Sequence, residues 1–126
     1  MRKKLSILFC AILMSGCWDE RQYKDFSVVS MVGHEGEIGD LTSYFSVPTI
    51  SEGVTTSSIV KGQGKSTREA RMNADLNSNQ TIDVSKLSVL LYSDESAKSD
   101  LYEYLGVYYR NARNQLSTYI ALTEGS

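Results

Sequence analysis

The chain of 126 residues has few of the side chains that catalytic and metal sites require. It holds one His (His34) and two Cys (Cys10 and Cys17), which excludes a zinc site built from His and Cys alone and a scaffold of several disulfides. Basic residues cluster only in the first four positions, so the phosphate-binding footprint of a nucleic-acid-binding protein is missing. With 41% hydrophobic and 22% charged residues, the sequence predicts one small folded domain.

The first residues have the pattern of an export signal. Met1-Arg2-Lys3-Lys4 is cationic, and an apolar run from Leu5 to Met14 follows it. The stretch from Leu5 to Gly16 would be about 18 Å long as a helix, at ~1.5 Å per residue. A bilayer core needs about 20 apolar residues, so this segment is too short to remain as a membrane anchor.

The segment Met14-Ser15-Gly16-Cys17 resembles the lipobox of bacterial lipoproteins. In that motif the Cys sulfur receives a diacylglyceryl group, and the small residues before it admit the signal peptidase. We therefore expect cleavage between Gly16 and Cys17, with Cys17 carrying S-diacylglyceryl and N-acyl groups. An ordinary buried Cys is the alternative, but it leaves the Lys-rich start and the small pair unexplained. Such acylation is enough for lasting membrane attachment.

Cleavage at this point would change the charge and the thiol content of the chain. Arg2, Lys3, Lys4 and Cys10 would leave with residues 1–16, so the mature chain would hold 10 basic against 15 acidic residues, a net charge of −5. An acidic body beside an anionic bilayer implies that lipid, and not surface charge, would hold the domain there.

The residues after the lipobox resemble the Ger(x)C family of spore-germination lipoproteins. The resemblance begins with the signature Cys17-Trp18-Asp19-Glu20-Arg21, which is specific when it adjoins a lipobox. Weaker matches follow in the family's order, at residues 64–71, 85–91 and 119–125. Family members continue into further domains, so the resemblance implies that this chain covers only part of the N-terminal domain.

This resemblance implies a function without catalysis. We expect a membrane-tethered subunit of a spore nutrient germinant receptor, anchored to the outer face of the inner spore membrane. Its expected partners are two integral-membrane subunits, of the A and B type; no cofactor, metal or nucleic acid is expected. A truncated remnant without function and a stand-alone lipoprotein that binds a small solute are the alternatives.

The predicted domains are a lipoprotein signal peptide (1–16), a lipidated tether (17–25) and one incomplete Ger(x)C-like N-terminal domain (26–126). In the tether, Trp18 suits the headgroup region of a bilayer, while Asp19 and Arg21 are candidates for contact with the domain or a partner. A merely solvated tether is the alternative reading of these three residues.

Hydrophobic periodicity predicts an α+β fold, a mixed sheet with about two helices packed on it in the order β-β-β-α-β-α-β. The expected strands are 26–32, 41–47, 58–61, 86–92 and 116–123. The expected helices begin at a capping box on Ser66 and at a cap on Ser99. Ala70, Ala74 and Leu76 should add contacts from the first helix, and Leu101, Tyr104, Leu105 and Tyr108 from the second.

Two motifs suggest chemistry, but each has a simpler explanation. Gly62-Gln63-Gly64-Lys65-Ser66-Thr67 is similar to a phosphate-binding loop, yet Ile59 stands where that loop needs its first Gly. A tight turn into a capped helix explains the same residues. His34 lies near Glu35, Glu37 and Asp40, which suggests a metal or acid/base cluster, but a turn-rich connection over 33–40 predicts a solvated loop.

Tyrosines are the most abundant aromatic residues, at eight in the chain. Tyr102, Tyr104, Tyr108 and Tyr109 fall within the second predicted helix. They either form a contact surface or lie at the edge of the core, and the sequence leaves both readings open.

Overall fold

Ten helices and strands follow one another in residues 26–124, the residues that the computed structural model describes. Their bounds are β1 Phe26–Val28, β2 Met31–Glu37, β3 Asp40–Ser51, β4 Val54–Gly64, α2 Thr67–Asn77, β5 Thr81–Asp83, β6 Val89–Ser93, α3 Asp94–Lys98, α4 Leu101–Tyr109 and β7 Tyr119–Thr123.

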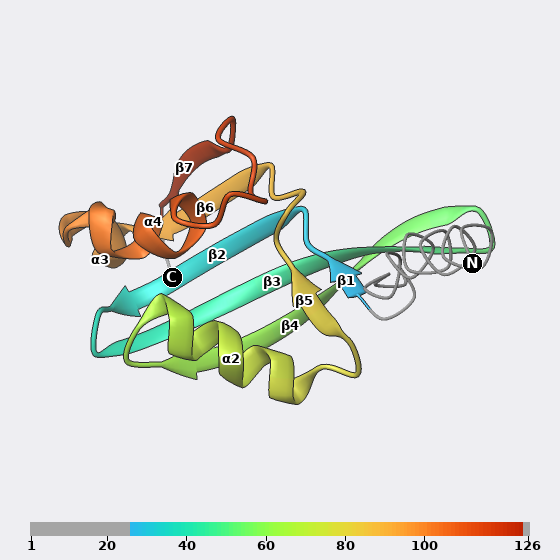
Figure 1. The fold of residues 1–126 in the computed structure, drawn as a ribbon, viewed down its shortest axis with the longest axis horizontal. Coiled ribbons are helices and arrows are strands. Elements are labelled where there is room, and N and C mark those ends of the chain that lie inside the picture. Colours follow the sequence, from blue (N-terminus) through green and yellow to red (C-terminus); the bar gives the residue numbers. More distant parts are fainter. Residues whose placement is uncertain (1–25, 125–126) are drawn as a thin grey trace, which may run out of the picture.

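Five of the strands form one mixed sheet in the order β4-β3-β2-β6-β7 (Figure 1). β4, β3 and β2 pair antiparallel, whereas β2–β6 and β6–β7 pair parallel. β1 and β5 make a separate parallel pair. The α+β class and the mixed sheet are confirmed, while β5 and the short α3 add to the predicted element order.

Alternation along the strands gives the sheet two different faces. One face, called here the covered face, packs against α2 and α4 and contains the core. Its fully buried strand residues include Val32, Leu41, Phe45, Leu90 and Tyr92. The opposite face, called the open face, carries Met31, Gly33, Glu35, Tyr44, Ser46, Ile59, Leu91 and Tyr119, and no described helix packs on it.

Helix α2 lies very close to β4 because small residues meet on both sides. Ala70 and Ala74 are fully buried against the strand. A Cβ added to Gly62 would overlap the Ala70 carbonyl oxygen and lie 2.6 Å from the Ala74 nitrogen, and one on Gly64 would lie 2.5 Å from the Ala70 nitrogen. These glycines therefore serve helix packing, which agrees with the simpler explanation of the Gly-Lys-Ser segment.

The helix caps agree with the predictions in part. The Ser66 hydroxyl accepts from the Glu69 amide at 3.3 Å, as the capping box predicts. The Glu69 carboxylate, however, accepts from the Lys65 amide at 2.8 Å instead of the Ser66 amide. Helix α4 is capped by Asp100, whose carboxylate accepts from the Tyr102 amide at 3.0 Å, and not by Ser99.

The first predicted strand, 26–32, is wrong because the chain changes partners within it. Phe26–Val28 pairs with β5, and the main sheet is joined only from Met31. Between them, the Val29 amide donates to the Asp83 carbonyl at 2.8 Å and the Ser30 amide donates to the Ser46 carbonyl at 3.1 Å. The buried Val29 side chain fixes this crossing point in the core.

The hairpin of β3 and β4 is longer than predicted. β3 continues past Pro48, which is tolerated because β2 ends its pairing at Ser46 and leaves β3 with only one neighbour there. β4 begins already at Val54, four residues before the predicted strand 58–61. Glu52 and Gly53 form the two-residue turn, both with positive φ (52° and 81°), as the favoured hairpin turns require.

Two predictions for the later elements are corrected. Leu76 does not add to the core, since its side chain is 84% exposed at the end of α2. The last strand is shorter than predicted, beginning at Tyr119, and its Ile120 and Leu122 are exposed although they pair with the buried Leu90 and Tyr92. In α4 the predicted inward stripe is confirmed, with Tyr104 and Tyr108 buried and Leu101 and Leu105 half-buried.

Candidate functional site

The residues predicted for lipidation, cleavage and tether contact lie outside the described residues. Gly16, Cys17, Trp18, Asp19 and Arg21 precede Phe26, where the description begins. Lipidation, cleavage and tether contact therefore stay predictions. The candidate site that the structure adds lies elsewhere, on the open face of the sheet.

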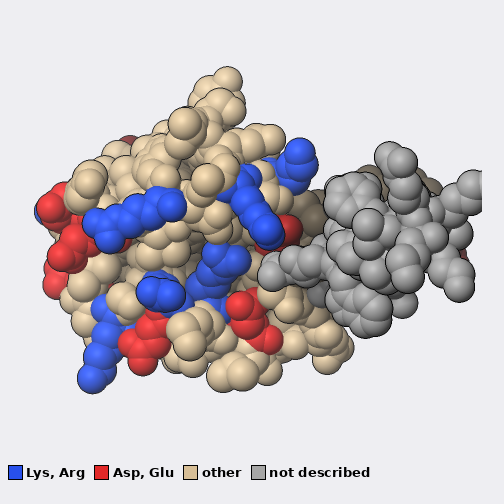
Figure 2. All heavy atoms as spheres, in the orientation of Figure 1, with Lys and Arg blue, Asp and Glu red and all other residues tan. Residues whose placement is uncertain are grey.

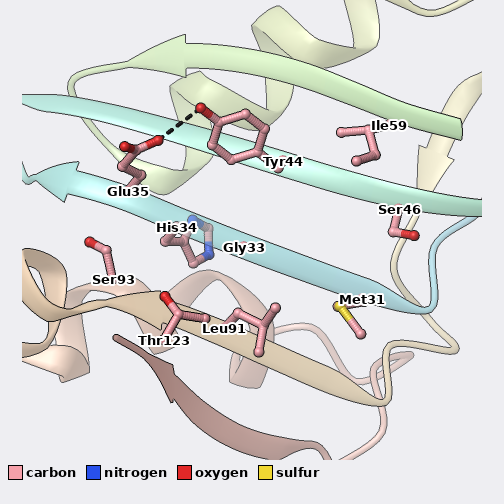
Figure 3. Close-up of a pocket in the computed structure, with 10 residues that line it drawn as sticks. All are labelled: Met31, Gly33, His34, Glu35, Tyr44, Ser46, Ile59, Leu91, Ser93 and Thr123. Carbon is pink, nitrogen blue, oxygen red and sulfur yellow. Dashed lines mark hydrogen bonds between the residues drawn. The ribbon is translucent and has the colours of Figure 1, made fainter. Parts of the chain in front are cut away.

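The open face holds a shallow trough above Gly33, of about 320 Å³ (Figure 3). Its floor is Gly33, whose missing side chain leaves room between Tyr44 and Leu91 on the neighbouring strands. A Cβ placed on Gly33 would meet the Cβ atoms of these neighbours only at 3.9 and 4.0 Å. The residues that line the trough are Met31, Gly33, His34, Glu35, Tyr44, Ser46, Ile59, Leu91, Ser93 and Thr123.

The lining is apolar toward one end of the strands and polar toward the other. The strand register places Ile59, Ser46, Met31, Val89 and Tyr119 in one row across the sheet. Two residues further along, Lys61, Tyr44, Gly33, Leu91 and Ala121 form the next row. Glu35 and Ser93 lie beyond that row, so the face becomes polar toward the ends of β2 and β6.

A tyrosine–carboxylate pair marks the polar end of the trough. The Tyr44 hydroxyl donates to the Glu35 carboxylate at 2.8 Å, the contact drawn in Figure 3. This hydrogen bond, with smaller contributions from burial and the negative charge, raises the pKa of Tyr44. The Lys61 ammonium lies 5.5 Å from the centre of the Tyr44 ring, so a cation also borders this position.

Directly behind the trough, on the covered face, lies a buried histidine. His34 is only 2% exposed, so the predicted solvated loop is wrong. The prediction failed because β2 continues through Gly33–Glu37, and alternation turns His34 inward between Gly33 and Glu35. The signal was present in the alternation of Val32 and His34 with Met31, Gly33 and Glu35, but the glycines suggested a turn.

Both ring nitrogens of His34 have hydroxyl partners. Nδ1 lies 2.9 Å from the Ser43 Oγ, and Nε2 lies 3.0 Å from the Tyr108 hydroxyl. Burial lowers the pKa of His34 to about 4, so the ring is neutral at physiological pH. Ser43 and His34 resemble a nucleophile and its base, but Ser43 is 0% exposed and a substrate does not reach it.

The His34 side chain instead helps to hold α4 on the sheet, and the Gly36 carbonyl of the same strand holds both α3 and α4. Tyr108 reaches His34 from α4, and the Tyr104 hydroxyl donates to the Gly36 carbonyl at 3.3 Å. Ser96 of α3 donates to the same carbonyl. The two tyrosines are therefore core residues, while Tyr102 and Tyr109 of the same helix are exposed. Of the four tyrosines, only Tyr102 and Tyr109 are accessible for the contact surface that was one of the two readings.

A second groove, of about 550 Å³, separates α2 from α4. Arg68, Arg71 and Arg110 line it together with Asp75. Arg71 is already engaged, since it donates to the Ile82 carbonyl at 2.9 Å. Basic and acidic side chains are interspersed over the molecular face seen in Figure 2, so this face shows no extended surface of one charge.

Neither a metal centre nor a membrane-spanning helix is found within residues 26–124. No group of three or more His, Cys, Asp or Glu side chains lies close enough together there to hold a metal ion. No helix in the described part of the chain combines the length and the apolar character that a bilayer crossing needs.

Comparison with known proteins identifies one family. Residues 19–126 match the family model described as the spore germination protein N-terminal domain. No curated protein and no solved structure gives a significant match. The matched region begins two residues after Cys17 and includes every described strand and helix.

Proposed function

We propose that this chain, which belongs to the spore germination protein N-terminal domain family, is a lipid-anchored, non-catalytic subunit of a nutrient germinant receptor. The observation that carries the proposal is a junction in the sequence. The family match begins at Asp19, and the lipobox ends at Cys17. A folded domain of this family would then follow its anchor by a few residues, and two-dimensional confinement would raise its concentration beside membrane partners.

The described residues support a role in binding and not in catalysis. The single His is buried and hydrogen-bonded on both sides, so it is not available as a base. The largely uncharged open face offers a contact surface for a partner instead. We propose integral-membrane subunits of the A and B type as these partners, with the outer face of the inner spore membrane as the location.

The experiment is isolation of the chain from detergent-solubilised spore membranes. A version with a C-terminal tag should retain the A- and B-type subunits, and Cys17→Ala should abolish fatty-acid labelling and release the chain from the membrane. Germination should weaken for at least one nutrient when the gene is deleted. A wild-type chain without a fatty acid, or one isolated without either subunit, would contradict the proposal.

A second candidate function rests on the trough above Gly33. Its 320 Å³ is at the small end of the range of ligand pockets, and its apolar walls with a Tyr44–Glu35 pair suit a small amphipathic solute. A stand-alone solute-binding lipoprotein would bind free amino acids or sugars in calorimetry. Gly33→Leu, which fills the trough, should then abolish the heat of binding.

A further inference from the structure

We propose that the tip of the β3–β4 hairpin docks on the phospholipid bilayer, with Ile50 and Val54 as its apolar contacts. This inference rests on the proposed lipid anchor at Cys17, and it adds a second, non-covalent membrane contact made by the folded domain itself. Three features of the hairpin support it: its projection, its exposed side chains and its low charge.

The hairpin projects beyond the rest of the sheet. β2 pairs with β3 only as far as Ser46, whereas the β3–β4 pairing continues to Ser51 and Val54 (Figure 1). The five residues of β3 after Ser46 extend about 17 Å at ~3.4 Å per residue. This length reaches out as a two-stranded ribbon on which no described helix packs.

Large apolar side chains near the tip are exposed on both sides of this ribbon. Ile50 is 76% exposed and Val54 is 61% exposed. Ile50 pairs with Thr55, and Val54 pairs with Ser51, so alternation turns Ile50 and Val54 to opposite faces of the hairpin. A flat partner surface would cover only one of them, whereas insertion of the tip into the interface of a bilayer covers both.

The tip is also poor in charged residues, within a chain that is acidic. Between Pro48 and Val60, Glu52 is the single charged residue, and the remaining polar residues are Ser and Thr. An anionic bilayer would repel a domain with a mature charge of −5, and the single negative charge of this segment adds little to that repulsion. Glu52 lies in the turn, where its carboxylate can remain among the headgroups.

The topology places the tip at the same end of the sheet as Phe26, the residue at which the described part of the chain begins. β1 precedes β2, and β2 begins opposite Ser46, so Phe26 enters the fold at the hairpin end of the sheet. Phe26 is nine positions after Cys17 in the chain, a span of at most about 30 Å. Because the anchor keeps the domain at this distance, a weak contact by two apolar side chains is sufficient for docking.

The test places a fluorescent probe at the tip of the lipidated chain. In the mature protein Cys10 would be removed and Cys17 acylated, so Ile50→Cys would supply the one free thiol for labelling with an environment-sensitive dye. The chain is reconstituted in vesicles of phosphatidylglycerol and phosphatidylethanolamine with nitroxide-labelled lipid. We expect a blue-shifted emission that the nitroxide quenches about twofold or more.

The matched control is Ile38→Cys, with the same dye. Ile38 lies in the turn between β2 and β3, at the far end of β3, and is 37% exposed. Its emission should be neither shifted nor quenched. Equal quenching at both positions, or none at Ile50, would overturn the docking of the hairpin.

A second variant keeps the test valid if the dye itself attracts position 50 to lipid. In this variant the dye is attached to Thr55→Cys. Adding Ile50→Ser and Val54→Ser to the same chain should then remove the quenching of the dye. All three sites are exposed, so circular dichroism should show an unchanged fold. Quenching that persists in this variant contradicts the proposal, as does quenching that requires the integral-membrane subunits.

Flotation of the wild-type chain with the vesicles separates the two proposals. A chain that does not float and carries no fatty acid refutes the anchor, and the hairpin proposal falls with it. A chain that floats while its tip stays unquenched refutes the hairpin proposal alone.

Discussion

The two faces of the sheet use the same kind of residue for opposite purposes. On the covered face, Gly62 lets α2 approach so closely that even a methyl group would overlap the helix backbone. On the open face, Gly33 leaves an unfilled trough in which a methyl group meets only ordinary contacts. The comparison teaches that glycine in one sheet can mark tight packing in one place and a vacant surface in another.

Substitution of these two glycines should give the largest difference between the faces in the free energy of unfolding. Gly62→Ala should lower the free energy of unfolding by about 3 kcal/mol, because α2 must shift away from β4. Gly33→Ala should stay within about 1 kcal/mol of the parent. Urea unfolding in a common Cys17→Ala background measures both, and equal losses would show that the faces do not differ in packing.

Acid should destabilise the covered face through His34. Burial lowers the pKa of His34 from the ordinary 6.5 to about 4 in the folded chain. As the pH falls below 6.5 the unfolded chain takes up the proton first, so stability present at neutral pH is progressively lost down to pH 4. From pH 7.5 to pH 5 the loss from this group is about 2 kcal/mol.

His34→Gln is the control for this pH dependence. The variant has no titrating ring, so its unfolding free energy should vary less between pH 7.5 and pH 5 than that of the parent. Measurement above pH 5 keeps most carboxyl groups ionised in both chains. An identical slope in parent and variant would assign the acid sensitivity to other groups.

The link between α4 and the sheet should give the next smaller effect. Tyr108→Phe removes the hydroxyl at 3.0 Å from His34 Nε2 and leaves that nitrogen buried without a partner. We expect a loss of about 1–2 kcal/mol in the free energy of unfolding. Tyr102→Phe, at a position that is 71% exposed on the same helix, should change it by less than about 0.5 kcal/mol.

The smallest effect is expected from the hydrogen bond on the open face. Tyr44→Phe removes the donor to Glu35 and should cost less than about 1 kcal/mol, because the part-exposed Glu35 carboxylate regains water. Glu35→Gln should lower the pKa of Tyr44, since the carboxylate is the main cause of its raised value. Ultraviolet titration of tyrosine measures this shift, and an unchanged curve would contradict the pairing.

The sequence predicted the features that depend on strong local signals. The capped start of α2, the inward stripe of α4 and the α+β class follow from periodicity and capping chemistry, and the structure confirms them. The family resemblance was equally accessible, because Cys17 to Arg21 form a specific local signature, and the family match confirms it.

What the sequence did not predict depends on distant partners. The buried His34 ring finds its hydroxyl partners in Ser43 and Tyr108, and Tyr108 is 74 residues away in the chain. Pro48 continues a strand because β2 is absent beside it, which local propensity does not reveal. The trough above Gly33 likewise exists only after β3, β2 and β6 have been brought side by side.

The strand order also sets a sequence of events in folding. The β3–β4 hairpin closes over a two-residue turn, so its pairing requires little loop entropy and forms within microseconds. The parallel pairing of Met31 with Val89 must close a far longer loop across α2 and β5, and the entropy of this closure is lost before the contacts between the strands stabilise the chain. We therefore expect the domain to assemble from its hairpin outward, with β6, α4 and β7 docking last and opening first.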